Sequence, residues 1–431
     1  MKHSASDDLD FTRSEVSTSE RSSGLHLALI VIGGTIGFSV FIVAAQIGGS
    51  LGYTKAAAAF ALGGLCLGIL GALTSYVGAR TRLSTYLLTR YAFGSAGSKL
   101  VNMAIALSLV GWYGVICNFL GQAGQHLVAA FSGVTPPNSL LVLIASALMI
   151  GVTLRGFTGI DRLALYLVPV MVVFLVYSAY RSIGEGMTAS DELTDTFSFT
   201  TAVSAVIGSY IAGVVIQPDY SRFARSISGA VWAIFIALGV VFPLVQFLSS
   251  IPSLAAGNPD LLAVMAALGL GVPAFFLLAL GAWSSNVLCL YSSGLSLATI
   301  AHDLPLRRII AGIGALGTVI AFVPAQDYLV QFLVLLGVLI PPIAAIYLLD
   351  AFVARRFHYP EDTDGGQSAF YWPALAAWLA GVVFGFLSYL HILQLTRVAS
   401  LDSLLATAVV FLVSIQHRLR RRSNASSPSV Y

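Results

Sequence analysis

Long apolar stretches alternate with short polar loops along almost the whole chain. A helix needs about 20 residues to cross the hydrocarbon core of a bilayer, and most of these stretches reach or approach that length. They are rich in Leu, Ala, Val and Gly and lack the alternation of membrane β-strands. Because helices are then the remaining way to pair backbone groups in lipid, the pattern predicts an all-α integral membrane protein. The twelve predicted spans are residues 25–49, 55–78, 100–129, 139–154, 163–180, 198–217, 228–251, 272–299, 309–324, 328–353, 369–389 and 399–416.

Two polar segments frame a membrane domain predicted at residues 25–417. Residues 1–24 are rich in Ser, Thr and Asp and predict a disordered tail, because they lack the short apolar core of a signal peptide. Residues 418–431 predict a second, basic and polar tail. Its Arg-rich start either anchors the topology or contacts anionic lipid headgroups. A short helix on the outer surface is expected within 258–270.

The distribution of basic residues tests the number of spans. Twelve spans place both termini on one side, and if that side is the cytoplasm, 19 of the 22 Lys and Arg residues fall in cytoplasmic segments. This asymmetry agrees with the positive-inside rule. We therefore expect a multi-pass protein of the plasma (inner) membrane, embedded in the bilayer, with both termini cytoplasmic.

The composition narrows the function. Of the 431 residues, 57% are hydrophobic and only 10% are charged, whereas soluble proteins carry about 25% charge. A soluble enzyme and a nucleic-acid partner are therefore not expected. The few ionisable side chains within the spans lie near span ends, among them Asp161, Asp219 and Asp350. Because carriers of charged substrates keep buried charged partners, we expect a neutral substrate, and with no charge or metal cluster at membrane depth we expect no enzyme.

Glycine clusters occur near the middle of the first and sixth spans, at residues 33–37 and 208–213. Glycine disfavours a helix by about 1 kcal/mol relative to alanine, so both clusters are predicted break points. In transporters built from two inverted five-helix repeats, the first helix of each repeat is broken and binds substrate and ion. Close helix packing through small residues is the alternative interpretation.

The eighth span carries Ser284, Ser285 and Asn286 in succession. The two hydroxyls could help to coordinate a sodium ion, or they could bond back to the carbonyl four residues earlier. The amide of Asn286 both donates and accepts, so it could recognise a heterocycle with adjacent C=O and N–H groups.

Aromatic residues are predicted to hold a flat ligand. Trp112 lies in mid-span between Gly111 and Gly114, which would leave room over its indole. Tyr210, beside Ser209 in the sixth span, could supply the second face of an aromatic sandwich, worth about 1 kcal/mol per face. A packed or lipid-facing Trp112 is the alternative.

Five motifs in order resemble the nucleobase–cation symporters, and among them the cytosine permeases. The motifs are residues 78–94, Gly111-Trp112-Tyr113-Gly114, residues 208–223, residues 283–295 and Ile340-Pro341-Pro342 leading to Asp350. The resemblance covers nearly the whole chain. It implies a LeuT-type fold of twelve transmembrane helices, a 5+5 inverted repeat with broken helices 1 and 6. The repeats would cover about 25–180 and 198–353, with peripheral helices at about 369–416.

The resemblance also implies a function. It predicts secondary active import of a neutral nucleobase or related planar heterocycle, a cytosine-like pyrimidine or a purine, by cation symport and alternating access, in a protein expected to be monomeric. An amino-acid or amine carrier of the same fold, and a proton-coupled hydantoin or allantoin carrier, are the alternatives.

The resemblance assigns the site residue by residue. For the substrate it implies Trp112, Ser209, Tyr210, Asn286 and Gly37. For a sodium ion it implies the backbone oxygens of Gly33, Ile36 and Gly281 and the hydroxyls of Ser284 and Ser285. Cytosine permeases have Asp and Asn where this chain has Val287 and Leu288, so two polar groups near their site are absent here. Sodium is the expected coupling ion and a proton the alternative.

Overall fold

The computed structural model describes residues 21–35, 38–154, 160–184, 197–258, 261–298, 300–301, 304–360 and 368–425. In this part of the chain the regular structure is helical, apart from an isolated bridge between Ser22 and Ala224. The helices are α2 (Gly24–Thr35), α3 (Phe38–Thr81), α4 (Thr85–Phe93), α5 (Gly97–Ser132), α6 (Asn138–Leu154), α7 (Ile160–Gly184), α8 (Phe199–Val215), α9 (Gln217–Ser221), α10 (Ile227–Ile236), α11 (Phe242–Ala256), α12 (Leu261–Ala267), α13 (Gly271–Ala298), α14 (Leu306–Ile320), α15 (Ala325–Leu339), α16 (Pro341–Leu349), α17 (Trp372–Tyr389) and α18 (Ala399–Ala425), with π-helical turns η2 (Ala237–Val241) and η3 (Asp350–Ala354).

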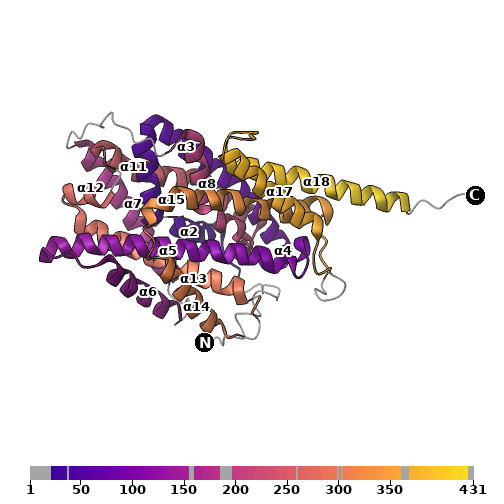
Figure 1. The fold of residues 1–431 in the computed structure, drawn as a ribbon, viewed down its shortest axis with the longest axis horizontal. Helices are drawn as coiled ribbons and strands as arrows, with labels where there is room; N and C mark the ends of the chain where they lie inside the picture. The colour runs from indigo at the N-terminus through magenta and orange to yellow at the C-terminus, as the bar shows by residue number, and fades with distance from the viewer. Residues whose placement is uncertain are drawn as a thin grey trace, which may run out of the picture.

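The helices pack into one bundle with the character of a membrane protein (Figure 1). Among the described residues, seven helical segments are long and apolar enough to cross a membrane, and four shorter helices are also apolar. Many large apolar side chains on the outside of the bundle are exposed, such as Ile69, Val173 and Leu379. In water such a surface would be unfavourable, whereas in lipid it is matched to its surroundings.

Most of the described residues in the predicted spans are helical. The second half of the first predicted span and the whole of the second lie on α3, which is 44 residues long and is kinked at Gly52. Gly52 has φ 72° and ψ 172°, a conformation that residues with a side chain rarely adopt. The short outer helix expected within 258–270 corresponds to α12.

The sixth span is interrupted later than its glycine cluster predicted. Helix α8 continues through residues 208–213 to Val215, and the interruption comes at Ile216, which has φ −87° and ψ 7°. Pro218 follows two residues later, in the first turn of α9. Because proline lacks the N–H and clashes with the preceding turn, it cannot continue α8 but is tolerated at the start of a new helix. Gly208 lies directly against the backbone carbonyl of Leu333 on α15. This glycine therefore serves close packing, the alternative given above.

The first span divides near its predicted break. Helix α2 ends at Thr35 and α3 begins at Phe38, while residues 36–37 lie outside the described part of the chain. Residues 33–35 of the predicted break are still helical, and a break at residues 36–37 stays a prediction.

The ends of the described chain are more ordered than expected. Ser22, assigned to the predicted tail, donates its N–H to Phe223 O at 2.7 Å and accepts from Arg225 N at 2.9 Å. At the other end, α18 continues as a helix through the basic cluster to Ala425 and projects beyond the bundle in Figure 1. Residues 1–20 and 426–431 lie outside the described residues.

Candidate functional site

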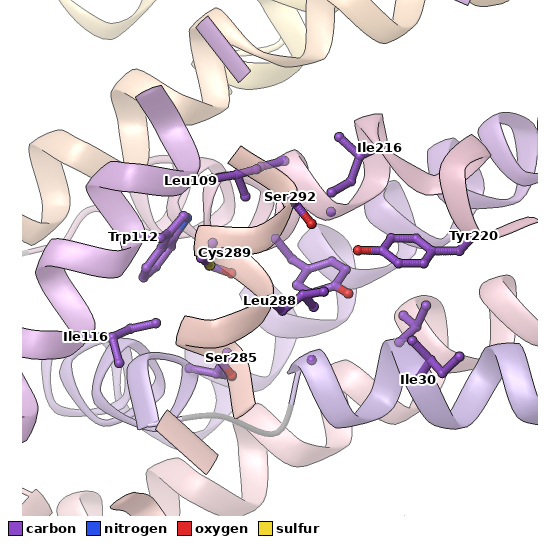
Figure 2. Close-up of a pocket in the computed structure, with 17 residues that line it drawn as sticks. Ile30, Leu109, Trp112, Ile116, Ile216, Tyr220, Ser285, Leu288, Cys289 and Ser292 are labelled. Atoms are coloured by element: carbon purple, nitrogen blue, oxygen red, sulfur yellow. The ribbon is translucent and has the colours of Figure 1, made fainter. Parts of the chain in front are cut away.

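A cavity of about 80 Å³ lies in the centre of the bundle, where the segments before and after the helix interruptions meet α5 and α13 (Figure 2). Seventeen residues line it, and twelve of them are apolar or glycine. The polar members are three serines and two tyrosines: Ser209, Tyr210, Tyr220, Ser285 and Ser292. A cavity with mostly apolar walls and a few hydroxyls suits a neutral ligand.

Helix α5 contributes one face of the cavity through residues at helical spacing. Leu109, Trp112 and Ile116 all line it, which the periodicity of a helix explains because these positions share one side. Trp112 is 6% exposed, so its indole is buried at the cavity wall. Trp112, predicted from the sequence, is therefore at the cavity.

The glycines beside Trp112 do not open space over the indole, contrary to the expectation from the sequence. A Cβ atom on Gly111 would lie 2.7 Å from the ring of Phe332 on α15, and one on Gly114 would lie 2.8 Å from Ile320 on α14. The space beside both glycines is filled by neighbouring helices. These glycines therefore allow α14 and α15 to approach α5 closely.

Helix α8 brings Ser209 and Tyr210 to the same cavity. The Ser209 hydroxyl donates to Val206 O at 2.7 Å. The Tyr210 ring packs against Phe242 of α11, with centroids 5.9 Å apart, and a Cβ atom on Gly34 of α2 would lie 3.3 Å from the Tyr210 hydroxyl. The predicted aromatic residues Trp112 and Tyr210 thus line one cavity from two different helices.

Helix α13 lines the cavity with Ser285, Leu288, Cys289 and Ser292. The hydroxyl of Ser285 is buried and has no hydrogen-bond partner among the described residues. The alternative in which it bonds back to the carbonyl of Gly281 is therefore not realised. A hydroxyl oxygen without a partner is free to coordinate a cation.

The other predicted cation ligands do not line the cavity or lie outside the described residues. Ser284 is 8% exposed and Gly33 and Gly281 are buried, but none of these three lines the cavity. Ile36 and Gly37 lie outside the described residues. Among the residues described, no group of three or more His, Cys, Asp or Glu side chains could hold a metal ion. The available donors are neutral oxygens, which fit a hard monovalent cation better than a transition metal.

Asn286 is buried in the wall between α5 and α13 and does not line the cavity. Its Nδ2 donates to Cys117 Sγ at 3.2 Å, and its Oδ1 has no partner among the described residues. Asn118, the residue after Cys117 on α5, donates through Nδ2 to Ala321 O at 2.8 Å and accepts at Oδ1 from Ala325 N at 3.1 Å. It joins α5 to the connection between α14 and α15.

Several lining residues were not predicted from the sequence. Ile30 on α2, Ile216 and Tyr220 at α9, and Ser292 on α13 extend the cavity toward the end of the bundle where α2 begins (Figure 2). Ser292 lies two helical turns after Ser285, so helical spacing alone could have found it. Tyr220 follows the interruption at Ile216, which the glycine pattern had misplaced.

Charged side chains close the bundle at this same end. Arg82 donates to the carbonyls of Arg222 and Ala224, both at 2.6 Å. Asp219 accepts from the first N–H of α4, Thr85 N, at 2.7 Å, and burial raises the pKa of this carboxyl. Asp219 therefore caps a helix other than its own.

Comparison with known proteins gives consistent matches over nearly the full length. The family model described as "Permease for cytosine/purines, uracil, thiamine, allantoin" matches residues 15–406. Cytosine permeases of Escherichia coli strain K12 and of O157:H7 are 28% identical over 386 residues, which is 88% of this chain and 90% of theirs.

Solved structures share the fold. The inward-facing conformation of Mhp1 aligns with TM-score 0.81 at 19% identity, over 95% of this chain and 94% of that one. Mhp1, a nucleobase–cation-symport-1 family transporter, in a closed conformation with bromovinylhydantoin bound aligns at 0.78 and 21%, over 94% of both chains. A Na⁺-coupled sialic acid symporter aligns at 0.66 and 14%, over 96% of this chain and 95% of that one.

Proposed function

Because the chain belongs to the family of permeases for cytosine and purines, uracil, thiamine and allantoin, we propose that it imports a neutral nucleobase or a related planar heterocycle together with a cation. It is a membrane transporter of the nucleobase–cation symporter family and not an enzyme. The observation that carries the proposal is the central cavity, which brings together Trp112, Tyr210 and the unpartnered hydroxyl of Ser285, with no charged side chain among the described residues that line it.

The proposed substrate stacks on Trp112, with Tyr210 and Ser209 on the opposing helix. The amide of Asn286 and the segment at Gly37 are proposed to form hydrogen bonds with its polar edge. The mainly apolar lining supports a substrate that is flat and uncharged, because burial of an unpaired charge in such a cavity would be unfavourable. Leu288, where cytosine permeases carry a polar residue, is in the lining. A ligand with fewer polar groups than cytosine fits this wall.

The proposed coupling ion is sodium, held by Ser284 and Ser285 with backbone oxygens of Gly33, Ile36 and Gly281. Support comes from the unpartnered Ser285 oxygen, which lies in the cavity wall on α13. A bound cation would be coordinated by oxygens of the α2–α3 segment and of α13 at once, and would thereby hold these two parts of the bundle together. Proton coupling is the alternative.

The proposed topology has twelve spans in two inverted repeats of five, two peripheral helices and both termini in the cytoplasm. Support comes from basic side chains that lie beside the segment where α2 begins. Arg82 donates to the carbonyls of Arg222 and Ala224, and Arg225 donates through Nε to the carbonyl of Arg21. Under this topology the cavity extends toward the cytoplasmic end of the bundle.

Transport by purified protein in proteoliposomes tests the proposal. We expect saturable uptake of a radiolabelled heterocycle that rises when a sodium gradient is imposed inward. Competition by pyrimidines, purines, hydantoins, allantoin and amino acids then identifies the substrate class. Uptake driven equally by a proton gradient without sodium would exclude sodium coupling, and competition by amino acids alone would exclude a nucleobase-like substrate.

A further inference from the structure

The side chains of Asn286 and Cys117 meet at the seam between the two helices that form one wall of the cavity. On α13 the neighbouring residues Ser285 and Cys289 line the cavity, and on α5 Ile116 does so (Figure 2). Asn286 and Cys117 are themselves fully buried, with 0% exposure each. Asn286 therefore lies directly beside the cavity-lining residues of α13.

The bond that holds Asn286 at the seam is weak. The amide Nδ2 lies 3.2 Å from Cys117 Sγ, and sulfur is a poor hydrogen-bond acceptor. A thiol can instead donate its S–H to an amide oxygen, so either end of the amide can be held by Cys117. In both arrangements the other end is left without a partner.

The free end of the amide is unfavourable where it is. Asn286 Oδ1 is buried and unpartnered among the described residues. Tyr113, one turn before Cys117, is already engaged with Ser146 O at 3.2 Å. Because a buried carbonyl without a partner carries the full desolvation cost, the amide gives up little when it leaves the seam.

We propose that Asn286 has two positions and that Cys117 is the positioning residue that holds its amide at the seam while the cavity is empty. On this inference, which rests on the proposed function, the amide turns to the cavity when a ring with adjacent C=O and N–H groups occupies it. Such a ligand pairs both ends of the amide at once, whereas Cys117 pairs only one. A ring that offers only a donor or only an acceptor pairs one end of the amide, as Cys117 already does. Such a ring does not compensate for the hydrogen bond to Cys117 that is lost when the amide turns to the cavity.

Substitutions at Cys117 that change its hydrogen-bonding strength test the inference. Equilibrium binding of radiolabelled cytosine, uracil, hypoxanthine and hydantoin is measured on the full-length protein in detergent. Cys117→Ser places a stronger acceptor at the seam, so we expect the Kd to rise about fivefold, the size of one neutral hydrogen bond. Cys117→Ala removes the acceptor, so the Kd is expected to stay the same or fall. Cys66→Ala, on α3 and away from the seam, is the matched control.

A double-mutant cycle separates positioning from packing. In an Asn286→Ala background, Cys117→Ser and Cys117→Ala are expected to have equal Kd values. Equal shifts of the two Cys117 variants in the same direction, or shifts that persist without the Asn286 amide, would overturn the inference. If Asn286→Ala abolishes binding, the comparison in the native background decides alone: a rise in Kd for Cys117→Ser without a rise for Cys117→Ala supports the inference, and any other result overturns it.

The outcomes also separate this inference from the proposed function. Wild-type protein that binds none of the four rings contradicts the proposed function, and the two-position amide is rejected with it. Wild-type binding with additive Cys117 and Asn286 effects contradicts the inference alone.

Discussion

The indole of Trp112 and the ring of Phe332 meet edge to face, with their centroids 5.3 Å apart and their planes at 76°. Trp112 lines the cavity from α5, while Phe332 belongs to α15, which also packs on α8. The contact fixes the orientation of the indole from outside the cavity. It also couples Trp112, the proposed stacking residue, to the position of α15.

Replacement of Trp112 should weaken substrate binding according to the aromatic surface that is lost. For Trp112→Ala we expect at least about a tenfold rise in Kd, because stacking and apolar burial are both removed. Trp112→Phe should retain affinity within a few-fold. Trp232→Ala, on the exposed surface of α10, is the control and should bind normally. Normal binding by Trp112→Ala would reject the stacking model.

Removal of the Ser285 hydroxyl should weaken sodium dependence. Its Oγ has no partner among the described residues, so Ser285→Ala removes the proposed cation ligand without breaking a hydrogen bond within the described part of the chain. We expect the sodium concentration for half-maximal uptake to rise about tenfold or more, and Ser285→Thr to remain near wild type. Ser296→Ala, whose hydroxyl donates to Ser292 O, is the matched control on the same helix. Unchanged sodium dependence in Ser285→Ala would place the cation elsewhere.

A side chain at position 208 should disrupt the contact between α8 and α15. A Cβ atom on Gly208 would overlap the carbonyl oxygen of Leu333, and backbone cannot yield as a flexible side chain can. We expect Gly208→Ala to destabilise the protein by about 1–3 kcal/mol and to lower the Tm of the detergent-solubilised protein.

The control for this prediction is another helical glycine with open space around it. A Cβ atom on Gly312 of α14 would meet nothing within 4 Å. Gly312→Ala should therefore leave the Tm unchanged or raise it, since alanine favours a helix by up to about 1 kcal/mol. A lower Tm in both variants would mean that general helix strain, and not the Leu333 contact, is responsible.

Loss of the Arg82 guanidinium should loosen the segment that precedes α2. Arg82 holds the carbonyls of Arg222 and Ala224, and the adjacent residues pair with Ser22. We expect Arg82→Ala to increase amide hydrogen exchange at Ser22 and Arg225 in particular. Arg80→Ala, which removes a side chain packed over Phe357 at 5.1 Å, should not. Unchanged exchange in Arg82→Ala would show that the bridge is stable on its own.

Asp402 should be important for the connection between α17 and α18. Its carboxylate accepts from Ser388 Oγ at 2.5 Å, Thr396 N at 2.7 Å and Leu395 N at 3.1 Å. Asp402→Ala leaves these donors without the carboxylate, so we expect a loss of about 2–4 kcal/mol of stability. Asp402→Asn should lose less. Asp327→Ala, at the exposed start of α15, is the control, and equal loss in both would contradict a specific role for Asp402.

The helices were predictable from the sequence because apolar runs in lipid have few other structures available. The predicted spans therefore coincide with helices even where propensity is poor. The interruption of the sixth span was misplaced because glycine clusters signal both breaks and close packing, and only the partner helix distinguishes them. At Gly208 the partner is the Leu333 carbonyl, which no local pattern in the sequence reveals.

The candidate site was partly predictable for the same reason. Four residues could be predicted because each is a polar or aromatic residue inside an apolar span, and all four line one cavity: Trp112, Ser209, Tyr210 and Ser285. Asn286 stood out equally but lies one residue beyond the cavity-facing stripe of α13. Tyr220 reaches the cavity because the helix is interrupted at Ile216. It was not predicted as a lining residue because the interruption was expected earlier, at the glycine cluster.

The lining of the cavity has a consequence for the pH profile of transport. None of the described residues in it is formally charged at neutral pH, so no carboxylate, amine or imidazole there changes its affinity for cargo between mild acid and mild base. Under the proposed sodium coupling, we expect the ionisation of the cargo itself to set the profile. A ring that loses a proton as the medium becomes alkaline should be accepted only in its uncharged form, and the midpoint of its decline in uptake should follow the acidity of each ring tested.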